Sequence, residues 1–373
     1  MITKLKLENF KIFQSQDFKI APFTLITGIN GMGKSSIIQS LLLLKQSYVT
    51  TNLLQAQPKV DLANDFINLE SAENLCYGLA PDNEKNVSIE IDDSNFGIHK
   101  WIINASTPKL KVLDCVHTGA DNFQSISLFS EDFIYLDAER WGPREIYSRK
   151  KEKRTFNTKL GIQGELTPSY LADAISPLEY IGISEMKHQS LDDSLSLYEN
   201  VNAWMSDVLS FPIKARTEDI GQDRIKLSYN MEGARGGSYS ALQVGFGITF
   251  CLPVIVAALR AKKGDLIIVE NPEAHLHPSA QVKIGLLLAV ASKNGVQIIM
   301  ESHSDHILNS VRFAFREGIL NNDLLEILFI RNTKNGETTA AYPDYVNVLE
   351  RGKLDHRPPD FFDVWDNMLT KLL

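Results

Sequence analysis

The stretch Thr24-Leu-Ile-Thr-Gly-Ile-Asn-Gly-Met-Gly-Lys-Ser-Ser36 is the part of the chain from which the rest can be interpreted. It passes from an apolar segment with the composition of a buried strand into the start of a helix. At the junction, Gly28-x-x-x-x-Gly33-Lys34-Ser35 fits the P-loop pattern without a mismatch. An ordinary glycine turn is the alternative, but a full match between a strand and a helix is uncommon by chance. The stretch therefore predicts a nucleotide-binding loop.

The chemistry of such a loop explains its composition. Glycines let the backbone adopt φ > 0 and bring N–H groups against phosphate oxygens, while the following helix points its positive end at the same anion. Lys34 would neutralise the β- and γ-phosphates of ATP, and Ser35 would ligate Mg²⁺. The residues expected to contact the nucleotide are Gly28, Ile29, Asn30, Gly31, Met32, Gly33, Lys34, Ser35 and Ser36.

Length and composition limit the class of protein. A chain of 373 residues can form one large α/β domain with insertions, and its 44% hydrophobic and 23% charged residues are ordinary for a globular protein. The longest apolar run, Phe250 to Leu259, contains Pro253 and is too short to span a bilayer. The first residues lack the pattern of a signal peptide, so we expect a cytoplasmic protein without a membrane segment.

Cysteine content and net charge exclude further classes. The three cysteines, Cys76, Cys115 and Cys251, are too few and too scattered for a disulfide framework or a zinc site. A formal net charge of -8 argues against a protein coated with nucleic acid, although a local basic patch could still contact phosphates.

The first third of the chain reads mainly as strands. Residues 2–10 alternate apolar and polar side chains, a second strand is expected near 18–20, and residues 35–48 predict the helix after the loop. Between Asn86 and Phe129 the pattern changes to short alternating stretches broken by turn residues, which is typical of an antiparallel sheet of hairpins. The strands expected there are residues 87–91, 97–103 and 125–128.

The middle of the chain offers three features with two interpretations each. A strand starting at Phe133 leads into a loop with Arg140 and Arg144, which could recognise an anion or form structural contacts. The basic run at residues 149–154 could hold a nucleic-acid backbone or an acidic partner, although a solvated loop is the commoner role. Residues 166–209 have helical character, and Trp204 there is better explained by packing than by ligand contact.

A second chemical centre is predicted between residues 243 and 306. Residues 243–259 begin with glycines and continue as an apolar helix, so the helix start presents bare N–H groups. Asp265 to Glu270 is an apolar strand that ends in a carboxylate, the form of a Walker B element. Another buried strand, residues 296–300, follows the next helix and leads into Glu301-Ser-His-Ser-Asp-His306. This alternation predicts a largely parallel sheet with functional groups at its carboxyl edge.

The order of these pieces resembles the ABC-type head ATPases of the SMC, RecF and OLD group, and residues 1–48 and 230–312 carry that resemblance. Several further stretches resemble a subfamily of prokaryotic AAA-type ATPases found in anti-phage defence loci. They are residues 133–144, Val244 to Pro253, Glu270 to Pro278, Glu301 to His306 and Asp360 to Trp365.

The resemblance implies roles for particular residues. Lys34 and Ser35 correspond to the Walker A pair, Glu270 to the carboxylate that holds Mg²⁺, and His303 to the switch histidine that reaches the γ-phosphate. Gly245 and Gly247 stand in the signature loop that would complete the P-loop of a second copy. A satisfied core histidine would be the usual reading of His303, but its place after the strand next to Walker B favours the switch role.

Three departures from that pattern matter. Phe246 stands where the signature serine is expected, and no convincing Q-loop glutamine follows the first helix. Asn271 replaces the glutamate that activates water, and Glu273 is the nearby carboxylate that could substitute for it, so hydrolysis is expected to be slow. His275 and His277 have metal-like spacing without an evident third ligand, and we interpret them as structural.

These observations predict a P-loop NTPase with an ABC-type head: a mostly parallel core sheet flanked by helices, an antiparallel β subdomain and a small helical lobe. The implied function is an ATPase that dimerises around ATP·Mg²⁺ and acts as a switch in anti-phage defence, with an effector protein encoded nearby. A RecF-like DNA clamp is the alternative, and a small-molecule kinase explains the second centre poorly. The expected division of this single domain is a core at 1–60 and 210–340, a β subdomain at 80–135, a helical lobe at 150–210 and a tail at 341–373.

Overall fold

The structure is a computed structural model that describes residues 1–51, 53–78, 85–149, 159–175, 178–231, 237–335 and 338–358. The chain divides into two compact units, and each is made of segments that are separated in sequence. Unit 1 contains Met1–Ser130, Leu325–Leu349 and the described residues from Leu354 onward, and unit 2 contains Glu131–Leu324 and Glu350–Lys353. The subdomain boundaries expected from the sequence stay a prediction.

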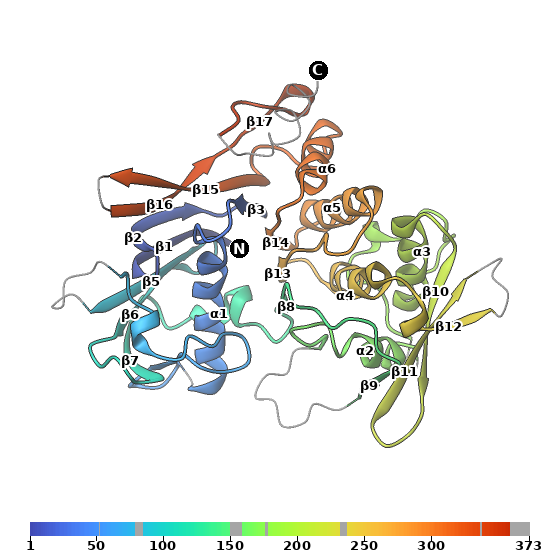
Figure 1. The fold of residues 1–373 in the computed structure, drawn as a ribbon, viewed down its shortest axis with the longest axis horizontal. Helices are drawn as coiled ribbons and strands as arrows, with labels where there is room; N and C mark the ends of the chain where they lie inside the picture. Colours follow the sequence, from blue (N-terminus) through green and yellow to red (C-terminus); the bar gives the residue numbers. More distant parts are fainter. Residues whose placement is uncertain are drawn as a thin grey trace. The chain divides into compact units, whose positions relative to one another are not determined.

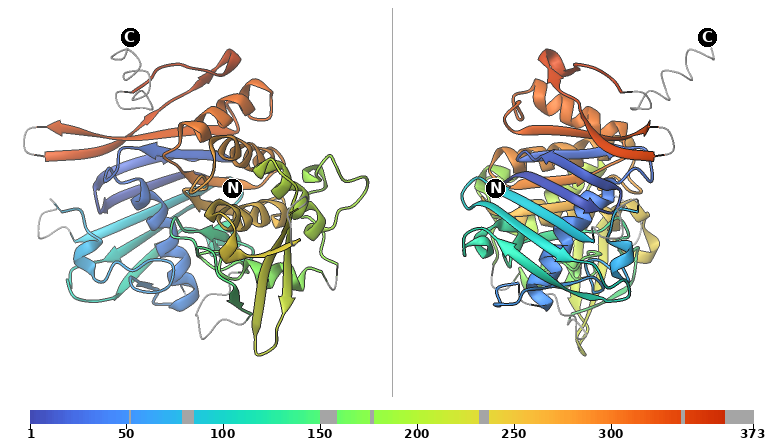
Figure 2. Two further views of the ribbon diagram at one scale, coloured as in Figure 1. Left: turned by 45° about the vertical axis from the view of Figure 1, so that its right-hand side comes forward. Right: turned by 90° about the vertical axis from the view of Figure 1, so that its left-hand side faces the viewer.

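An antiparallel sheet forms most of unit 1, with the strand order β2-β1-β5-β6-β7-β4. Alternation of buried and exposed residues along β1 and β6 places one face of this sheet in the core. In the right-hand view of Figure 2 the blue strands β1 and β2 run beside the cyan strands β5 and β6. The strands are β1 (Ile2–Phe10), β2 (Phe13–Lys19), β4 (Lys59–Asp61), β5 (Asn86–Asp93), β6 (Gly97–Asn104) and β7 (Val112–Thr118).

Unit 1 also carries the P-loop strand. β3 (Phe23–Gly28) pairs in parallel with β15 (Leu325–Asn335), which pairs antiparallel with β16 (Thr338–Tyr345). After β3 the chain enters α1 (Lys34–Thr50), whose central leucines, residues 41–44, are almost fully buried. The expected strand, loop and helix around Gly28 are therefore confirmed, and the strand beside β3 comes from late in the chain (Figure 1).

One of the predicted hairpin strands is wrong. Residues 125–128 form no strand; this segment contains two short 3₁₀ turns, Phe123–Ser125 and Ser127–Phe129. Ile126 and Leu128 are fully buried, but i→i+3 turns place them there instead of a strand ladder. The third strand of the hairpin sheet is β7, and the second strand of the chain, β2, begins earlier than expected.

Unit 2 contains the parallel strands of the second centre. β13 (Leu266–Glu270) pairs in parallel with β14 (Gln297–Glu301) on one side and β8 (Ile134–Leu136) on the other. The four residues of β13 before Glu270 are buried, as expected for the apolar run of a parallel strand covered on both faces. The predicted apolar strand that ends at Glu270 and the buried strand that follows it in the sequence are confirmed.

The helices of unit 2 differ in how much of their surface is apolar. α4 is buried along nearly its whole length, so its apolar residues extend around the helix, whereas α6 is strongly amphipathic. Figure 1 shows α3, α4 and α5 close together, in agreement with their mutual packing. The helices are α2 (Thr167–Asp173), α3 (Leu197–Leu209), α4 (Phe246–Arg260), α5 (Pro278–Lys293) and α6 (Asp305–Arg316).

A small antiparallel sheet in unit 2 was not predicted. The strand order is β10-β11-β12, and β9 also pairs with β11. Its two longer strands, β10 with seven residues and β11 with eight, alternate buried with more exposed side chains over much of their length. They are β9 (Ile146–Ser148), β10 (Ile213–Asp219), β11 (Arg224–Met231) and β12 (Ser238–Ser240).

The helical lobe expected at residues 150–210 stays a prediction as a division of the chain, and its described part contains α2 and α3 separated by irregular chain. Residues 150–154 of the basic run and the Asp360–Trp365 stretch lie outside the described residues. No helix in the described ranges combines the length and apolar content needed to cross a membrane. The remaining short elements are β17 (Val348–Leu349), β18 (Lys353–Leu354) and the 3₁₀ turns Ala72–Asn74, Ser184–Met186, Ala241–Gln243 and Glu350–Gly352.

Candidate functional site

The P-loop of unit 1 has the backbone that phosphate binding requires. Gly28, Gly31 and Gly33 have φ of 137°, 78° and 97°, all in the region that favours glycine. A Cβ on Gly28 would lie 2.5 Å from the carbonyl oxygen of Ile330, so the pairing of β3 with β15 leaves no room for a side chain. The exposed loop tip and the helix start at Lys34, which no side chain caps, are suited to an anion.

Lys34 lies folded over the loop. Its side chain is nearly buried, and its ammonium donates hydrogen bonds to the carbonyl oxygens of Gly28 at 2.9 Å and Ile29 at 2.8 Å. The amine is therefore held at the loop itself, as the Walker A assignment expects. Ser35 and Ser36 follow in the first turn of α1 and are half-buried.

In unit 2, two carboxylates end neighbouring strands. Glu270 ends β13 and Glu301 ends β14, and the two residues are register partners. Tyr135 of β8 donates a hydrogen bond to Glu270 Oε1 at 2.8 Å. Burial and the negative charge of Glu301 raise the pKa of Glu270 to about 7, and the Tyr135 hydrogen bond opposes that shift. Sequence reasoning missed Glu301, although its position at the end of the strand next to Walker B was a usable signal.

Arg140 is a structural residue of this centre. Its guanidinium donates to the backbone carbonyl oxygens of Glu270 at 2.7 Å, Asp137 at 3.0 Å and Asn271. Burial lowers its pKa to about 10, so the side chain stays protonated at neutral pH. Of the two interpretations of this arginine, the structural one fits these contacts. Arg144 differs, because it is exposed and its guanidinium carbon lies 3.8 Å from the centroid of the Trp141 ring.

Asn271 occupies a left-handed backbone position. Its φ is 44°, and its N–H donates to the carbonyl oxygen of Glu301 at 2.9 Å. Asparagine tolerates this conformation better than most residues with a side chain. Its side-chain oxygen is buried, and no described residue donates to it. The backbone of the turn thus gives a reason for asparagine at this position that does not depend on catalysis.

Glu273 and His303 are in direct contact. Glu273 Oε1 accepts the backbone N–H of His303 at 3.0 Å, whereas Oε2 is buried with no hydrogen-bond partner among the described residues. Burial raises the pKa of Glu273. The His303 ring is partly exposed, and its Nε2 lies 3.8 Å from Glu301 Oε1. The structure therefore brings together all four predicted catalytic residues of unit 2: Glu270, Asn271, Glu273 and His303.

The signature loop lies at the start of α4. Gly245 precedes the helix, and no side-chain hydrogen bond caps it. Gly247 is tightly packed, since a Cβ there would lie 2.6 Å from the carbonyl oxygen of His275, whereas a Cβ on Gly245 would meet nothing within 4 Å. Phe246, in place of the expected serine, is 55% exposed. The loop therefore presents an aromatic side chain and an open glycine at the surface.

The two histidines with metal-like spacing have structural contacts. The His275 ring packs against Phe250, with centroids 4.6 Å apart, and His277 Nδ1 accepts the N–H of Ser279 at the start of α5. In the described part of the chain, no three His, Cys, Asp or Glu side chains gather in a way that could hold a metal ion. The hydroxyl of Ser35 and the carboxylate of Glu270 are hard oxygen donors, which fit Mg²⁺ held largely by nucleotide phosphates and water.

Two protein families match the sequence. Residues 1–133 match a family described as "AAA ATPase domain". Residues 118–309, more than half of the chain, match the family described as "AAA domain, putative AbiEii toxin, Type IV TA system". The chain belongs to this AAA domain family.

Relatives and solved structures agree with this AAA domain assignment. The chain is 20% identical over 341 residues to a protein named Old nuclease from Escherichia phage P2, covering 84% of this chain and 58% of that relative. It resembles an SmcHead solved with the C-winged helix domain of ScpA, with 13% identity, a TM-score of 0.55, and coverage of 93% of this chain and 98% of that one.

A second Smc head domain, solved with the C-terminal domain of ScpA derived from Pyrococcus furiosus, has 13% identity and a TM-score of 0.51, and covers 100% of this chain and 99% of that one. These likenesses confirm the predicted fold. The AAA domain of this chain therefore has the fold of an SMC-type, ABC-type head domain.

Proposed function

We propose that this AAA domain protein binds ATP·Mg²⁺ at its P-loop and hydrolyses ATP slowly. The observation that carries the proposal is the loop itself: three glycines at positive φ, a buried lysine ammonium held over them and an uncapped helix start. Lys34 would exchange its bonds to loop carbonyls for bonds to β- and γ-phosphate oxygens. The loop N–H groups would bind the same phosphates.

The acidic centre would complete the chemistry. Ser35 and Glu270 would hold Mg²⁺, which when bound neutralises charge on the phosphate oxygens. Tyr135 orients the Glu270 carboxylate, and Arg140 fixes the backbone of the turn after it. His303 would contact the γ-phosphate.

Water activation is the weak step of this proposed mechanism. Asn271 can orient a water molecule, but its amide cannot accept a proton. Glu273 is the best substitute base, since its Oε2 is buried without a described partner and its raised pKa brings its proton affinity nearer to that needed at neutral pH. Its other oxygen is already bonded to the His303 N–H, so we expect slow turnover.

We further propose that ATP, but not ADP, promotes a homodimer through the signature loop, and that the closed dimer is a switch in anti-phage defence with a separate effector. The uncapped start of α4 at Gly245 and the exposed Phe246 support a partner at this surface. The likeness to the phage P2 relative, of which this chain spans 58%, supports the setting but does not carry its activity over. A RecF-like DNA-binding role is the alternative, and the net charge of -8 weighs against it.

Calorimetry with ATP·Mg²⁺ tests the proposal. Hydrogen bonds from an ammonium to phosphate contribute about 1.5–3 kcal/mol, so Lys34→Ala should weaken ATP binding by about ten- to a hundredfold. The control is Lys4→Ala, because Lys4 is an exposed lysine of unit 1 that pairs with Asp17. Equal affinity of the Lys34→Ala variant and the wild type would reject the P-loop assignment. An unfolded Lys34→Ala variant is recognised by its circular dichroism spectrum.

A further inference from the structure

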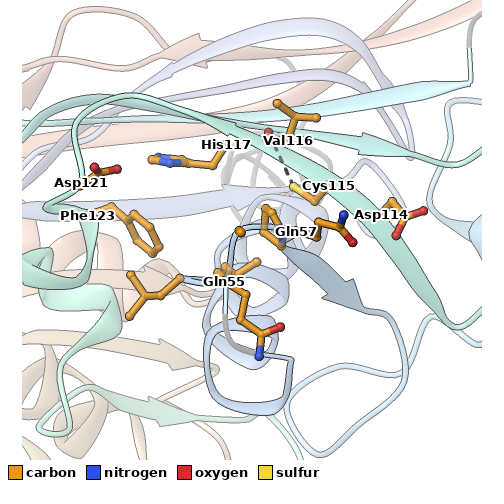
Figure 3. A pocket seen from close by; sticks show the side chains of 12 residues that line it. Gln55, Gln57, Asp114, Cys115, Val116, His117, Asp121 and Phe123 are labelled. Carbon is orange, nitrogen blue, oxygen red and sulfur yellow. Dashed lines mark hydrogen bonds between the residues drawn. The ribbon is translucent and has the colours of Figure 1, made fainter.

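A pocket of about 710 Å³ lies in unit 1, away from the P-loop residues. One wall is the segment Leu53–Pro58, which leads into β4, and the other is the second half of β7, as Figure 3 shows. The volume is within the range of ligand-binding pockets. The pocket forms where the pairing between β4 and β7 ends.

β4 and β7 pair antiparallel only as far as Lys59 and Asp114. One more bond extends the ladder, from the N–H of Cys115 to the carbonyl oxygen of Pro58 at 3.0 Å. Proline has no N–H, so it cannot return a bond to the Cys115 carbonyl, and the ladder ends there. The segment 53–57 then diverges from β7 and leaves the pocket between them.

β7 continues to Thr118, and its edge is open along the pocket. N–H and C=O groups alternate sides along a strand, so those of His117 point the same way as the Cys115 N–H, away from β6. If β4 continued in the same register, the backbone N–H and C=O of His117 would form hydrogen bonds with Ala56. Within the described residues, β7 has only β4 and β6 as neighbouring strands. The Cys115 carbonyl and both backbone groups of His117 therefore form a free strand edge, and no lysine or proline on β7 protects it.

The wall behind this edge is a packed cluster of rings. The His117 ring packs against the buried Phe123, with centroids 4.8 Å apart, and stacks on His99 at 5.4 Å. Trp101 contacts Phe123 in turn, at 5.5 Å. An edge that is already held in strand conformation loses little entropy when another strand pairs with it.

The pocket lining is acidic. Asp114 and Asp121 contribute carboxylates, and no lysine or arginine is among the lining residues, although Lys59 lies 3.8 Å from Asp114 outside the lining. His99 Nε2 lies 3.1 Å from the carbonyl oxygen of Phe96, and His99 Nδ1 lies 3.2 Å from His117 Nε2, so hydrogen bonds fix both rings beside the pocket. Burial lowers the pKa of His117, so this ring adds no positive charge at neutral pH.

We propose that the open edge of β7 at Cys115–His117 binds an extended, basic segment of a partner polypeptide, which pairs with it as an additional antiparallel strand. The pairing supplies main-chain hydrogen bonds, and Asp114 and Asp121 select lysine or arginine side chains. None of the described lining residues belongs to the P-loop, and the surface gives the chain a place to recruit another protein.

The test uses a fluorescent heptapeptide, Ser-Arg-Val-Arg-Val-Arg-Ser, and fluorescence anisotropy with the full chain. We expect saturable one-to-one binding. A matched peptide with glutamate for arginine should not bind, and a peptide N-methylated at every central amide should bind at least tenfold more weakly, because it keeps the charges but cannot pair as a strand. Equal binding of the methylated peptide would show adsorption by charge alone and overturn the proposal.

Variants locate the site. Gln57→Trp places a large side chain in the pocket and should weaken binding at least tenfold, whereas Gln14→Trp on the exposed part of β2 should not. Asp114→Asn combined with Asp121→Asn should weaken binding about three- to tenfold, because each exposed ion pair contributes only modestly, and Asp65→Asn is the control. Binding that is unaffected by Gln57→Trp, or a dimer of the chain itself that this variant dissociates, would overturn the proposal.

Discussion

The P-loop and the turn after β13 are both strand-to-helix connections of one chain, but they are built differently. The P-loop owes its conformation to glycines within the loop, and the ammonium of Lys34 bonds to the loop itself. The turn after Glu270 contains Asn271 at positive φ and is held by Arg140, which is distant in sequence.

This difference separates local from distant control of a functional turn. A loop that takes its conformation mainly from its own glycines can be recognised from a short motif. A turn held by Arg140 depends on a side chain that no short motif includes, and its carboxylates, Glu270 and Glu273, are half-buried. Substitutions in the two regions should therefore lower the free energy of unfolding for different reasons: backbone strain in the P-loop, and loss of a distant side-chain contact in the turn after β13.

The largest change in stability is expected for Gly28→Ala. The new Cβ would lie 2.5 Å from the Ile330 carbonyl oxygen at a φ of 137°, so backbone strain and overpacking add up to about 3–5 kcal/mol. Gly31→Ala is the matched control, since nothing lies within 4 Å of its Cβ and only the strain at φ 78° applies. Urea unfolding measures both. Equal losses would show that contact with β15 does not constrain the loop.

Arg140→Met should destabilise the chain by about 2–4 kcal/mol, because three backbone carbonyls would lose a charged donor. Arg144→Met, which changes an exposed arginine in the same loop, should cost less than about 1 kcal/mol. The same unfolding experiment compares them. If the two variants were equally stable, the turn after β13 would be self-supporting like the P-loop.

Asn271→Ala should cost about 1–2 kcal/mol, because alanine adopts positive φ poorly, whereas Asn271→Gly should be nearly neutral. Thermal unfolding without nucleotide measures this difference without involving catalysis. A loss with Gly that matches the loss with Ala would assign the cost to the asparagine side chain instead of the backbone.

Tyr135→Phe should have the smallest effect, about 0.5–1.5 kcal/mol, and it should depend on pH. The pKa of Glu270 is raised from 4.5 to about 7, so the folded state binds more protons than the unfolded state between these values, and stability contributed by this group falls as pH rises through that window. Removing the Tyr135 hydroxyl should raise this pKa further and extend the decline above pH 7. Unfolding in EDTA from pH 5 to 8 tests this, and Glu270→Gln should reduce the decline in both backgrounds by the part that Glu270 contributes, leaving the part from the raised pKa of Glu273.

Much of the fold was predictable from sequence because its strongest signals are local. The P-loop, the apolar strands β13 and β14 and the buried helix α4 all follow from contiguous composition. The strand predicted at residues 125–128 was wrong, because two consecutive 3₁₀ turns also bury the alternating apolar residues Ile126 and Leu128. Within the candidate site, Arg140 had two open interpretations and Glu301 was missed, since their roles depend on strands and turns that meet only in the folded chain.

The pairing of Gly28 with Ile330 also has a consequence for biosynthesis. The P-loop strand leaves the ribosome early, but the strand beside it, β15, is made only after the whole of the second unit's main segment. Bringing such distant segments together is slow and cannot begin before the late strand is available. The nascent chain therefore completes its nucleotide-binding strand pair near the end of translation, and a prematurely terminated product lacking residues 325–345 would carry the full P-loop motif without the strand that shapes it.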